Sequence, residues 1–394
     1  MLSFQKKRYI YEVDSHNRMK NTVKCIITLF MLVTLQGMIH ATETKEYARF
    51  EHFTTKDGLA SNRVFNLTQD STGFVWIATD FGLEQFDGIN FKHHQKKDYP
   101  NLHRNDIMYV GHLGHDRIVV GGFSGVFQEY DRGKDDFIDR MPAELDSIGY
   151  TQIRAVYISE EGEQYLQTNG GVYHYDKTSG SFNSKFPAFD ALKIDFVNTM
   201  YVDKRKRFWI GAINKLYVID EQGNKVHLFD MEHDGCGYVS NIIPLGNGKV
   251  AITFLSNEIW LVDTSSEEVG DLQKIPLPFH SVMKMIQTDD GRYWFATDGD
   301  GLWFTDDPIS PNARFKNLVP YGEAQNEIKK IYGLAKGNSG EIWLGTQNSG
   351  IWSYSKRGEE SVTFSGDIGF PSSSGYLSVS TSADLPPQRT LPLR

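Results

Sequence analysis

Short hydrophobic runs alternate with polar turns along most of the chain, and the first complete unit lies at residues 62–94. The runs are rich in β-branched and aromatic residues, so we predict strands over 63–69, 74–79, 83–86 and 90–94. Asp70 opens and Gly73 ends the segment between the first two strands, which is typical of a tight turn. Trp76 stands in the second predicted strand.

This unit recurs along the chain, with seven copies in all. With Trp76 as the reference position, the equivalent residues are Val119, Tyr165, Trp209, Ile252, Trp294 and Trp343. Successive reference positions are 42 to 49 residues apart. A period in the forties built of strands and turns is typical of propeller blades, which bury their cores against one another. The predicted fold class is therefore all-β, a seven-bladed β-propeller of four-stranded blades, with the reference tryptophans packed between blades.

Two segments are candidates for closing the ring. Residues 47–53 have the pattern of a fourth strand without a blade of its own. By pairing into the seventh blade they would remove an exposed edge. Residues 361–364 compete for the same position, and the pattern leaves both open.

The two ends of the chain differ from the repeats. Residues 19–41 combine basic residues, an apolar run and Ala41 at a predicted cleavage site, so we expect a signal peptide. A membrane anchor is the alternative, but the run is shorter than the ~20 residues of a spanning helix. Residues 1–18 fit no signal pattern and are expected to be a misassigned upstream start. The propeller is expected over 42–364, and 365–394 as a disordered or frame-shifted tail.

Charge and cysteine content narrow the class of protein. The formal net charge is −9, which disfavours a nucleic-acid partner. The chain has 2 cysteines, and removal of the leader would leave Cys236 alone. We therefore predict an exported protein that is held together by its core, without an intrachain disulfide.

The first copy has a family resemblance. The motif formed by 57–62 (DGLASN), 70–73 (DSTG), 76–79 (WIAT) and 86–88 (FDG) resembles the two-component regulator propeller repeat. The first, sixth and seventh copies match it best, whereas the second and fifth lack the aromatic reference residue. The resemblance covers roughly residues 44 to 360.

This resemblance implies a truncated N-terminal periplasmic sensor region of a Bacteroidetes-type hybrid two-component system. Family members continue into a following propeller, an Ig-like domain, an inner-membrane helix, a histidine kinase, a receiver and a DNA-binding module. Their ectodomains sense glycan fragments. The implied partners are an oligosaccharide or other small ligand and, in the full-length relative, the following propeller and the membrane-anchored kinase, with a homodimer as an open alternative. These 394 residues show no kinase or receiver pattern, so we expect no enzyme activity from them.

Many residues could serve as catalytic groups, but none of them stands out from the repeat pattern. Aspartates such as Asp70, Asp87 and Asp176 offer carboxylates for a glycosidase pair, yet they recur where turns and strand ends place them. His93 and His94 are adjacent on a predicted strand and point to opposite faces, so they do not share a metal ion. We predict no catalytic residue, no metal site and no cofactor. Propeller lyases use a histidine base, and the histidines open to that role are His115, His174, His227 and His280.

The remaining candidates are binding residues. In a propeller, the turns between second and third strands meet the connections between blades on one face around the central channel. The predicted ligand-binding residues in those turns are Asp80, Phe81, Phe123, Asn169, Asn214, Asp298, Asp300, Gln347 and Asn348. Those where a blade begins are Arg63, Arg104, Arg154 and Tyr238.

These residue types suit a carbohydrate, because planar hydrogen-bonding groups stand beside aromatic rings. Turns also favour Asn and Asp, and arginines equally serve salt bridges between blades, so both roles stay open. We therefore predict a non-catalytic propeller that senses a ligand, expected to be a glycan, as part of a hybrid two-component system. The alternatives are a propeller-type carbohydrate-active enzyme, either a glycoside hydrolase or a lyase, and a protein-interaction scaffold without a small ligand.

Overall fold

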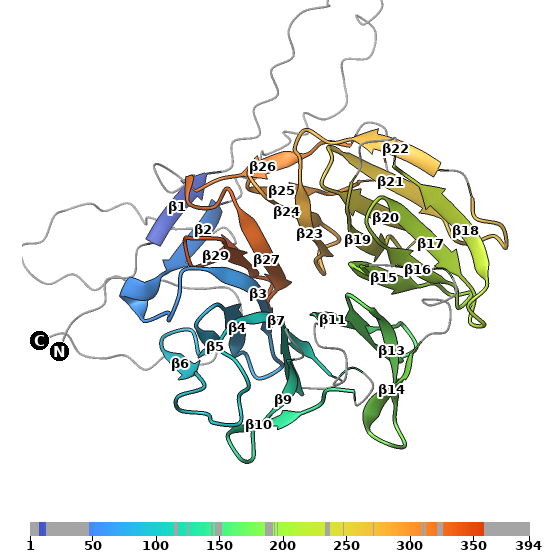
Figure 1. Cartoon of the computed structure of the whole chain (residues 1–394). Helices are drawn as coiled ribbons and strands as arrows, with labels where there is room; N and C mark the ends of the chain where they lie inside the picture. Colours follow the sequence, from blue (N-terminus) through green and yellow to red (C-terminus); the bar gives the residue numbers. More distant parts are fainter. Residues whose placement is uncertain are drawn as a thin grey trace, which may run out of the picture. The chain divides into compact units, whose positions relative to one another are not determined.

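The structure is a computed structural model of the chain. It describes residues 8–12, 47–113, 117–123, 126–142, 145, 152–185, 192, 194, 196–232, 237–246, 248–270, 272–308, 310, 313–320 and 326–357. The described strands form seven sheets arranged as the blades of a ring (Figure 1). The predicted seven-bladed all-β propeller is therefore confirmed. The predicted leader, the predicted tail, His115 and Cys236 lie outside the described residues.

The strands of each blade are denoted A to D from the axis outward. Blade 1 consists of β3 (Val64–Gln69), β4 (Val75–Thr79), β5 (Gly82–Phe86) and β6 (Phe91–His94). Blade 2 consists of β7 (Ile107–His112), β8 (Ile118–Gly122), β9 (Phe127–Asp131) and β10 (Asp136–Asp139). Blade 3 consists of β11 (Ile153–Ile158), β12 (Gln164–Thr168), β13 (Gly171–Asp176) and β14 (Ser181–Lys185).

The other blades follow the same order. Blade 4 consists of β15 (Thr199–Val202), β16 (Phe208–Gly211), β17 (Lys215–Ile219) and β18 (Lys225–Asp230). Blade 5 consists of β19 (Val239–Pro244), β20 (Lys249–Phe254), β21 (Glu258–Asp263) and β22 (Leu272–Pro276). Blade 6 consists of β23 (Val282–Gln287), β24 (Tyr293–Thr297), β25 (Leu302–Thr305) and β26 (Lys316–Leu318). Blade 7 begins with β27 (Ile331–Lys336), β28 (Ile342–Thr346) and β29 (Ile351–Arg357).

Local sequence decides where the strands of blade 1 begin and end. All four lie within one residue of the predicted bounds at each end. The turn between β3 and β4 is the one that the sequence indicates, because the Asp70 carboxylate accepts hydrogen bonds from the amides of Thr72 and Phe74, at 3.0 Å each. Gly73 has φ of +94°, which only glycine adopts without strain.

The ring is closed by the N-terminal segment. β2 (Tyr47–Phe53) lies beside β29 and supplies the fourth strand of blade 7, and β1 (Arg8–Glu12) adds a fifth. The 3-10 helix η1 (Thr55–Asp57) then leads from β2 toward blade 1. Of the two closing candidates, 47–53 is thus the one that the structure places in blade 7, whereas 361–364 lies outside the described residues.

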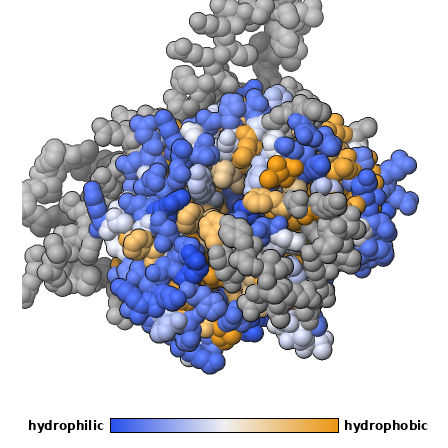
Figure 2. All heavy atoms as spheres, in the orientation of Figure 1, coloured by the Kyte–Doolittle hydropathy of each residue, from blue (hydrophilic) through white to orange (hydrophobic). Residues whose placement is uncertain are grey.

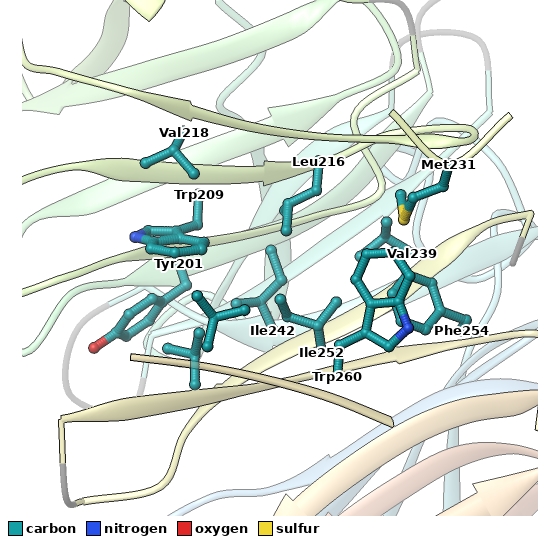
Figure 3. Close-up of a cluster of buried hydrophobic side chains, with 12 residues drawn as sticks. Tyr201, Trp209, Leu216, Val218, Met231, Val239, Ile242, Ile252, Phe254 and Trp260 are labelled. Carbon is teal, nitrogen blue, oxygen red and sulfur yellow. The ribbon is translucent and has the colours of Figure 1, made fainter. Parts of the chain in front are cut away.

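The hydrophobic core lies between neighbouring blades. Figure 3 shows the cluster between blades 4 and 5, in which Trp209 and Leu216 of one blade meet Val239, Ile252 and Trp260 of the next. The reference tryptophans are all buried, with 0% of Trp76 and Trp209, 2% of Trp294 and 7% of Trp343 exposed. Their predicted packing between blades is confirmed.

One buried carboxylate connects a strand, a turn and a neighbouring blade. Asp70 is fully buried and accepts a hydrogen bond from the Trp76 indole at 2.7 Å. Arg132 of blade 2 reaches the same carboxylate at 2.6 Å. Burial alone would raise the pKa of Asp70, but the bonds from Thr72, Trp76 and Arg132 outweigh it and lower the pKa below its usual 3.8.

Removal of the closing contact should destabilise the whole ring. Phe50 of β2 is fully buried, and its ring lies 6.3 Å from that of Trp352 and 5.5 Å from that of Tyr354. We expect Phe50→Ala to lower the free energy of unfolding by about 3–5 kcal/mol in urea titrations. Phe81→Ala is the control, because that side chain is 59% exposed, and it should change stability by less than about 0.5 kcal/mol. Equal urea midpoints for the two variants would contradict closure by β2.

Asp70→Ala should cost about 3–5 kcal/mol near neutral pH, because it leaves a buried indole N–H and Arg132 without their acceptor. Since the folded pKa of Asp70 is lowered, this stabilisation is present above pH 3.8 and is lost as the pH falls through the folded pKa. Urea midpoints of wild type and variant should converge in acid. Asp220→Ala, in an exposed turn of blade 4, should have a much smaller effect.

Candidate ligand-binding site

The strand register brings the predicted binding residues to one face of the propeller. In blade 1, Val64 at the start of strand A lies opposite Thr79, which also lies opposite Gly82 at the start of strand C. The end of strand D reaches the same edge, because His94 pairs with Leu83. The B–C turns and the connections into strand A therefore share one face, the BC face, while the A–B turns form the opposite, AB face.

A β-bulge near the start of strand A recurs in six blades. The register shifts there after the first residue, in β3, β7, β11, β19, β23 and β27. A bulge leaves one residue out of the ladder and turns its side chain away from the regular alternation. The bulged residues are all half-buried, and they are Phe65, Met108, Arg154, Ser240, Met283 and Tyr332.

The structure brings two of the predicted residues together with an aromatic ring that the sequence did not indicate. The Arg154 guanidinium lies over the Phe196 ring, 4.5 Å from its centroid, and it is close enough to the Tyr238 hydroxyl to act on the pKa of that phenol. The rings of Phe196 and Tyr238 are 6.3 Å apart. Burial raises the pKa of Tyr238 despite the nearby guanidinium, so the phenol stays neutral. A cation and two aromatic faces from three consecutive blades thus form one cluster, the arginine cluster.

A second group lies where blades 6, 7 and 1 meet. Lys330 Nζ is 3.4 Å from the Asp298 carboxylate, and the Tyr332 hydroxyl donates to the same carboxylate at 3.4 Å. Arg63 lies over the Phe65 ring, 5.0 Å from its centroid. The Asp298 carboxylate therefore has an ammonium group and a phenol hydroxyl beside it, whereas the Arg63 side chain remains exposed.

Two predicted residues have a structural role, which their hydrogen bonds or backbone conformation show. The Asn169 side chain accepts from the Gln152 amide at 2.8 Å, and its backbone bonds to Gln152 and Phe196. Asn214 has φ of +54°, the left-handed conformation that Asn tolerates in turns. These two residues hold B–C turns in shape.

Two other predicted residues are engaged in local pairs. Arg104 forms a two-point ion pair with Asp106, at 2.6 and 3.0 Å. Asp300 accepts from the His280 amide at 2.8 Å, and His280 Nδ1 is 3.4 Å from the same oxygen. Of the histidines weighed as a lyase base, His174 instead pairs with Glu163 near the AB face, and His227 lies on outer strand β18.

Exposed apolar side chains occur on the BC face. Phe81, Ile213 and Leu255 follow strand B in blades 1, 4 and 5 and are 59%, 50% and 40% exposed. Figure 2 shows hydrophobic residues near the middle of the ring within a mostly hydrophilic rim. The other predicted turn residues of this face are partly or fully exposed, and they are Asp80, Phe123, Gln347 and Asn348.

The residues that the sequence missed share a position. Phe65, Tyr332 and Met283 lie 11 residues before their reference tryptophans, as Arg154 lies 11 before Tyr165. Counting back from the reference residue would have found them. Phe196 has no such signal, because it belongs to the connection that precedes β15.

The described residues hold no group of three or more His, Cys, Asp and Glu side chains arranged to bind a metal ion. Within the same ranges, no helix has the length and apolar character needed to cross a membrane. A pocket of about 360 Å³ lies on the AB face, between blades 4 and 5, where Lys204, Arg205 and Lys249 contribute to its lining. None of the predicted binding residues lines this pocket.

Comparison with known proteins agrees with the sequence motif. Residues 58–81 match the family described as two component regulator propeller. The predicted resemblance to this repeat is confirmed over those residues. No curated protein matches the chain in sequence.

Solved structures share the fold. The extracellular domain of the hybrid two component system BT3049 from B. thetaiotaomicron has a TM-score of 0.64 and 20% identity, and the match covers 78% of this chain and 41% of that chain. The corresponding domain of BT4673 from the same organism has a TM-score of 0.62 and 17% identity, covering 81% of this chain and 42% of that one. Virginiamycin B lyase from Staphylococcus aureus has a TM-score of 0.54 and 12% identity, covering 78% and 98%. The chain thus spans about two fifths of the two B. thetaiotaomicron domains.

Substitutions at Asn214 separate turn chemistry from ligand contact. Asn214→Gly keeps the left-handed backbone and should leave the urea midpoint nearly unchanged, whereas Asn214→Ala should cost about 1 kcal/mol. If the glycine variant keeps its stability but loses ligand binding, the side chain has a direct role in recognition instead.

Proposed function

We propose that this chain is the ligand-recognition propeller of an exported two-component sensor and that its ligand is an oligosaccharide. The observation that carries the proposal is the arginine cluster of Arg154, Phe196 and Tyr238. Aromatic faces stack on the apolar faces of sugar rings, and a guanidinium beside them donates in-plane hydrogen bonds. The cluster stands on a rigid frame, on the face where loops vary.

The family match supports the sensing role. The segment 58–81 matches a repeat that is described by its place in two-component regulators, and the BT3049 and BT4673 domains with the same fold are extracellular. By analogy, this propeller acts outside the cytoplasm, in the periplasm, and signals to a membrane-anchored kinase. A following propeller and a homodimer are the further partners in this proposal.

The signalling step is indirect in this proposal. A ligand on the BC face bridges blades 3, 4 and 5 and changes how that face packs against a neighbouring domain or a second copy. Such a ligand shifts the sensor only by its difference in affinity for the two packing states. The propeller itself performs no chemistry.

An enzyme is the second candidate, and one observation favours it. His280 and Asp300 lie together on the BC face, with 3.4 Å between Nδ1 and the carboxylate. The fold is also that of virginiamycin B lyase. A histidine oriented by a carboxylate can act as a general base.

Thermal shift of the purified full chain against neutral and acidic tetrasaccharides tests recognition. A ligand at one hundred times its Kd stabilises by about 2.7 kcal/mol, so we expect Tm to rise by several degrees with a cognate sugar. Phe196→Ala should abolish this rise. Phe229→Ala on β18 is the matched control, a half-buried Phe away from the cluster that should keep the rise.

The same samples separate the candidate functions. Sugar cleavage that is detected by chromatography and lost in His280→Ala would favour the enzyme. A rise in Tm without cleavage supports the sensor. Neither binding nor cleavage would contradict both and leave the protein-interaction scaffold.

A further inference from the structure

Lys284 is a cation near the propeller axis without a counter-charge. It follows the bulged Met283 on β23 and lies opposite Ala296 of strand B. The side chain is half-buried, and burial lowers its pKa. Within the described ranges, no carboxylate pairs with its ammonium. Water would solvate the ammonium of a lysine on the outer rim, which would then need no counter-charge. Lys284 lies on an inner strand instead, so its ammonium lacks that solvation.

Two arginines of the BC face share this property. Arg154 contacts Phe196 and Tyr238, and its Nε is buried without a hydrogen-bond partner in the described part of the chain. Arg63 lies over Phe65 and likewise has no carboxylate partner there. Both guanidinium groups are therefore held in place by aromatic rings rather than by acids.

The contrast with the arginines that build the frame is clear. Arg132 pairs with Asp70 at 2.6 Å, Arg207 with Asp203 at 2.8 Å, and Arg292 with Asp306 at 3.0 Å. Further arginines with a carboxylate partner among the described residues are Arg49, Arg104, Arg117 and Arg140. These seven arginines are thus neutralised, whereas Arg63 and Arg154 have no carboxylate partner in the described part of the chain.

The acids of this face do not make up the difference. Asp298 is occupied by Lys330 and Tyr332, and Asp300 lies beside His280. Asp80 is the remaining acid among the predicted turn residues. Within the described residues, none of these three acids forms an ion pair with Lys284, Arg154 or Arg63.

We propose that the BC face binds an acidic oligosaccharide, with Lys284 and Arg154 receiving its carboxylate or sulfate groups. The inference rests on the proposed function and specifies its ligand class. A partly desolvated ammonium without a partner is costly, and an anionic ligand group offsets that cost. Guanidinium binds such groups with two parallel hydrogen bonds, while Phe196 and Tyr238 provide faces for the sugar ring.

Calorimetric titration of the purified full chain tests the ligand class. The probes are a galacturonic acid tetramer, a heparin-derived tetrasaccharide, neutral galactotetraose and sodium sulfate. We expect at least one acidic tetrasaccharide to bind more than tenfold tighter than galactotetraose. Lys284→Met and Arg154→Gln should each weaken it about tenfold or more, as expected for one charged hydrogen bond. Lys316→Met, on outer strand β26 of the same blade, is the matched control and should change affinity less than twofold.

A ligand-free measurement gives an independent readout. Lys284→Met removes a partly desolvated charge and keeps the chain length, so it should raise the Tm of the unliganded protein, while Lys316→Met should not. A lower Tm for Lys284→Met would assign the lysine to the frame and overturn the proposal.

The binding outcomes distinguish the two proposals. If galactotetraose binds as tightly as the acidic probes, or if Lys284→Met leaves affinity unchanged, the acidic ligand is wrong but sugar recognition stands. If sulfate binds and no tetrasaccharide does, the face is an ion site and both proposals fail. Failure of every probe to bind also overturns both. Tighter binding of the galacturonic acid tetramer identifies carboxylate as the group that the BC face recognises. Tighter binding of the heparin-derived tetrasaccharide identifies sulfate.

Discussion

In three blades the fold depends on giving the buried indole N–H of the reference tryptophan an acceptor. Trp76, Trp209 and Trp294 lie between blades, and each donates to the residue six positions earlier, Asp70, Asp203 or Thr288, at 2.7, 2.8 and 3.1 Å. An unpaired polar group at such a site would cost free energy, so strand B and the A–B turn have to be correct together. Because Arg132 of the next blade binds the Asp70 carboxylate, the same charge also fixes the interface between blades.

The copies that depart from this arrangement do so consistently. Where the reference residue is Val119 or Ile252, the sixth residue before it is Leu113 or Gly246, and no indole needs an acceptor. Blade 7 is different, because Gly337 precedes Trp343 and the indole nitrogen has no hydrogen-bond partner in the described residues. That blade is instead completed by β2, whose Phe50 packs on Trp352 and Tyr354. Closure by a distant segment thus takes over part of the stabilisation that a local bond supplies elsewhere.

The sequence predicts the frame well because the frame is local. Strand bounds in blade 1 follow from alternation and from the Asp70–Gly73 turn. The sequence pattern leaves 47–53 and 361–364 both open for closing the ring, and it is the structure that places 47–53 beside β29. The site is less predictable. The bulged residues mostly lie at a fixed spacing before the reference residue, but the side chains that meet them depend on tertiary packing. The place of Arg154 at the start of a blade predicts it as a binding residue, but its neighbour Phe196 comes from a connection whose path depends on tertiary packing. Asn169 and Asn214, which are equally polar, serve their turns.

The bulges explain how one frame can carry a variable site. In each bulged strand the first residue, such as Val64, Ile153 or Val282, is almost fully buried between blades. The next residue is released from the ladder, so its type is not constrained by the core, and it is Phe, Met, Arg, Ser or Tyr in different blades. The repeat pattern supplies no acidic residue to pair with a positively charged side chain at these positions or next to them. Among the described residues, Arg154 and Lys284 have no carboxylate partner for this reason, whereas Arg132 and Arg207 occupy positions where the neighbouring turn supplies a carboxylate. The charge left open on the BC face is therefore a consequence of the repeat geometry, and it is available to a ligand.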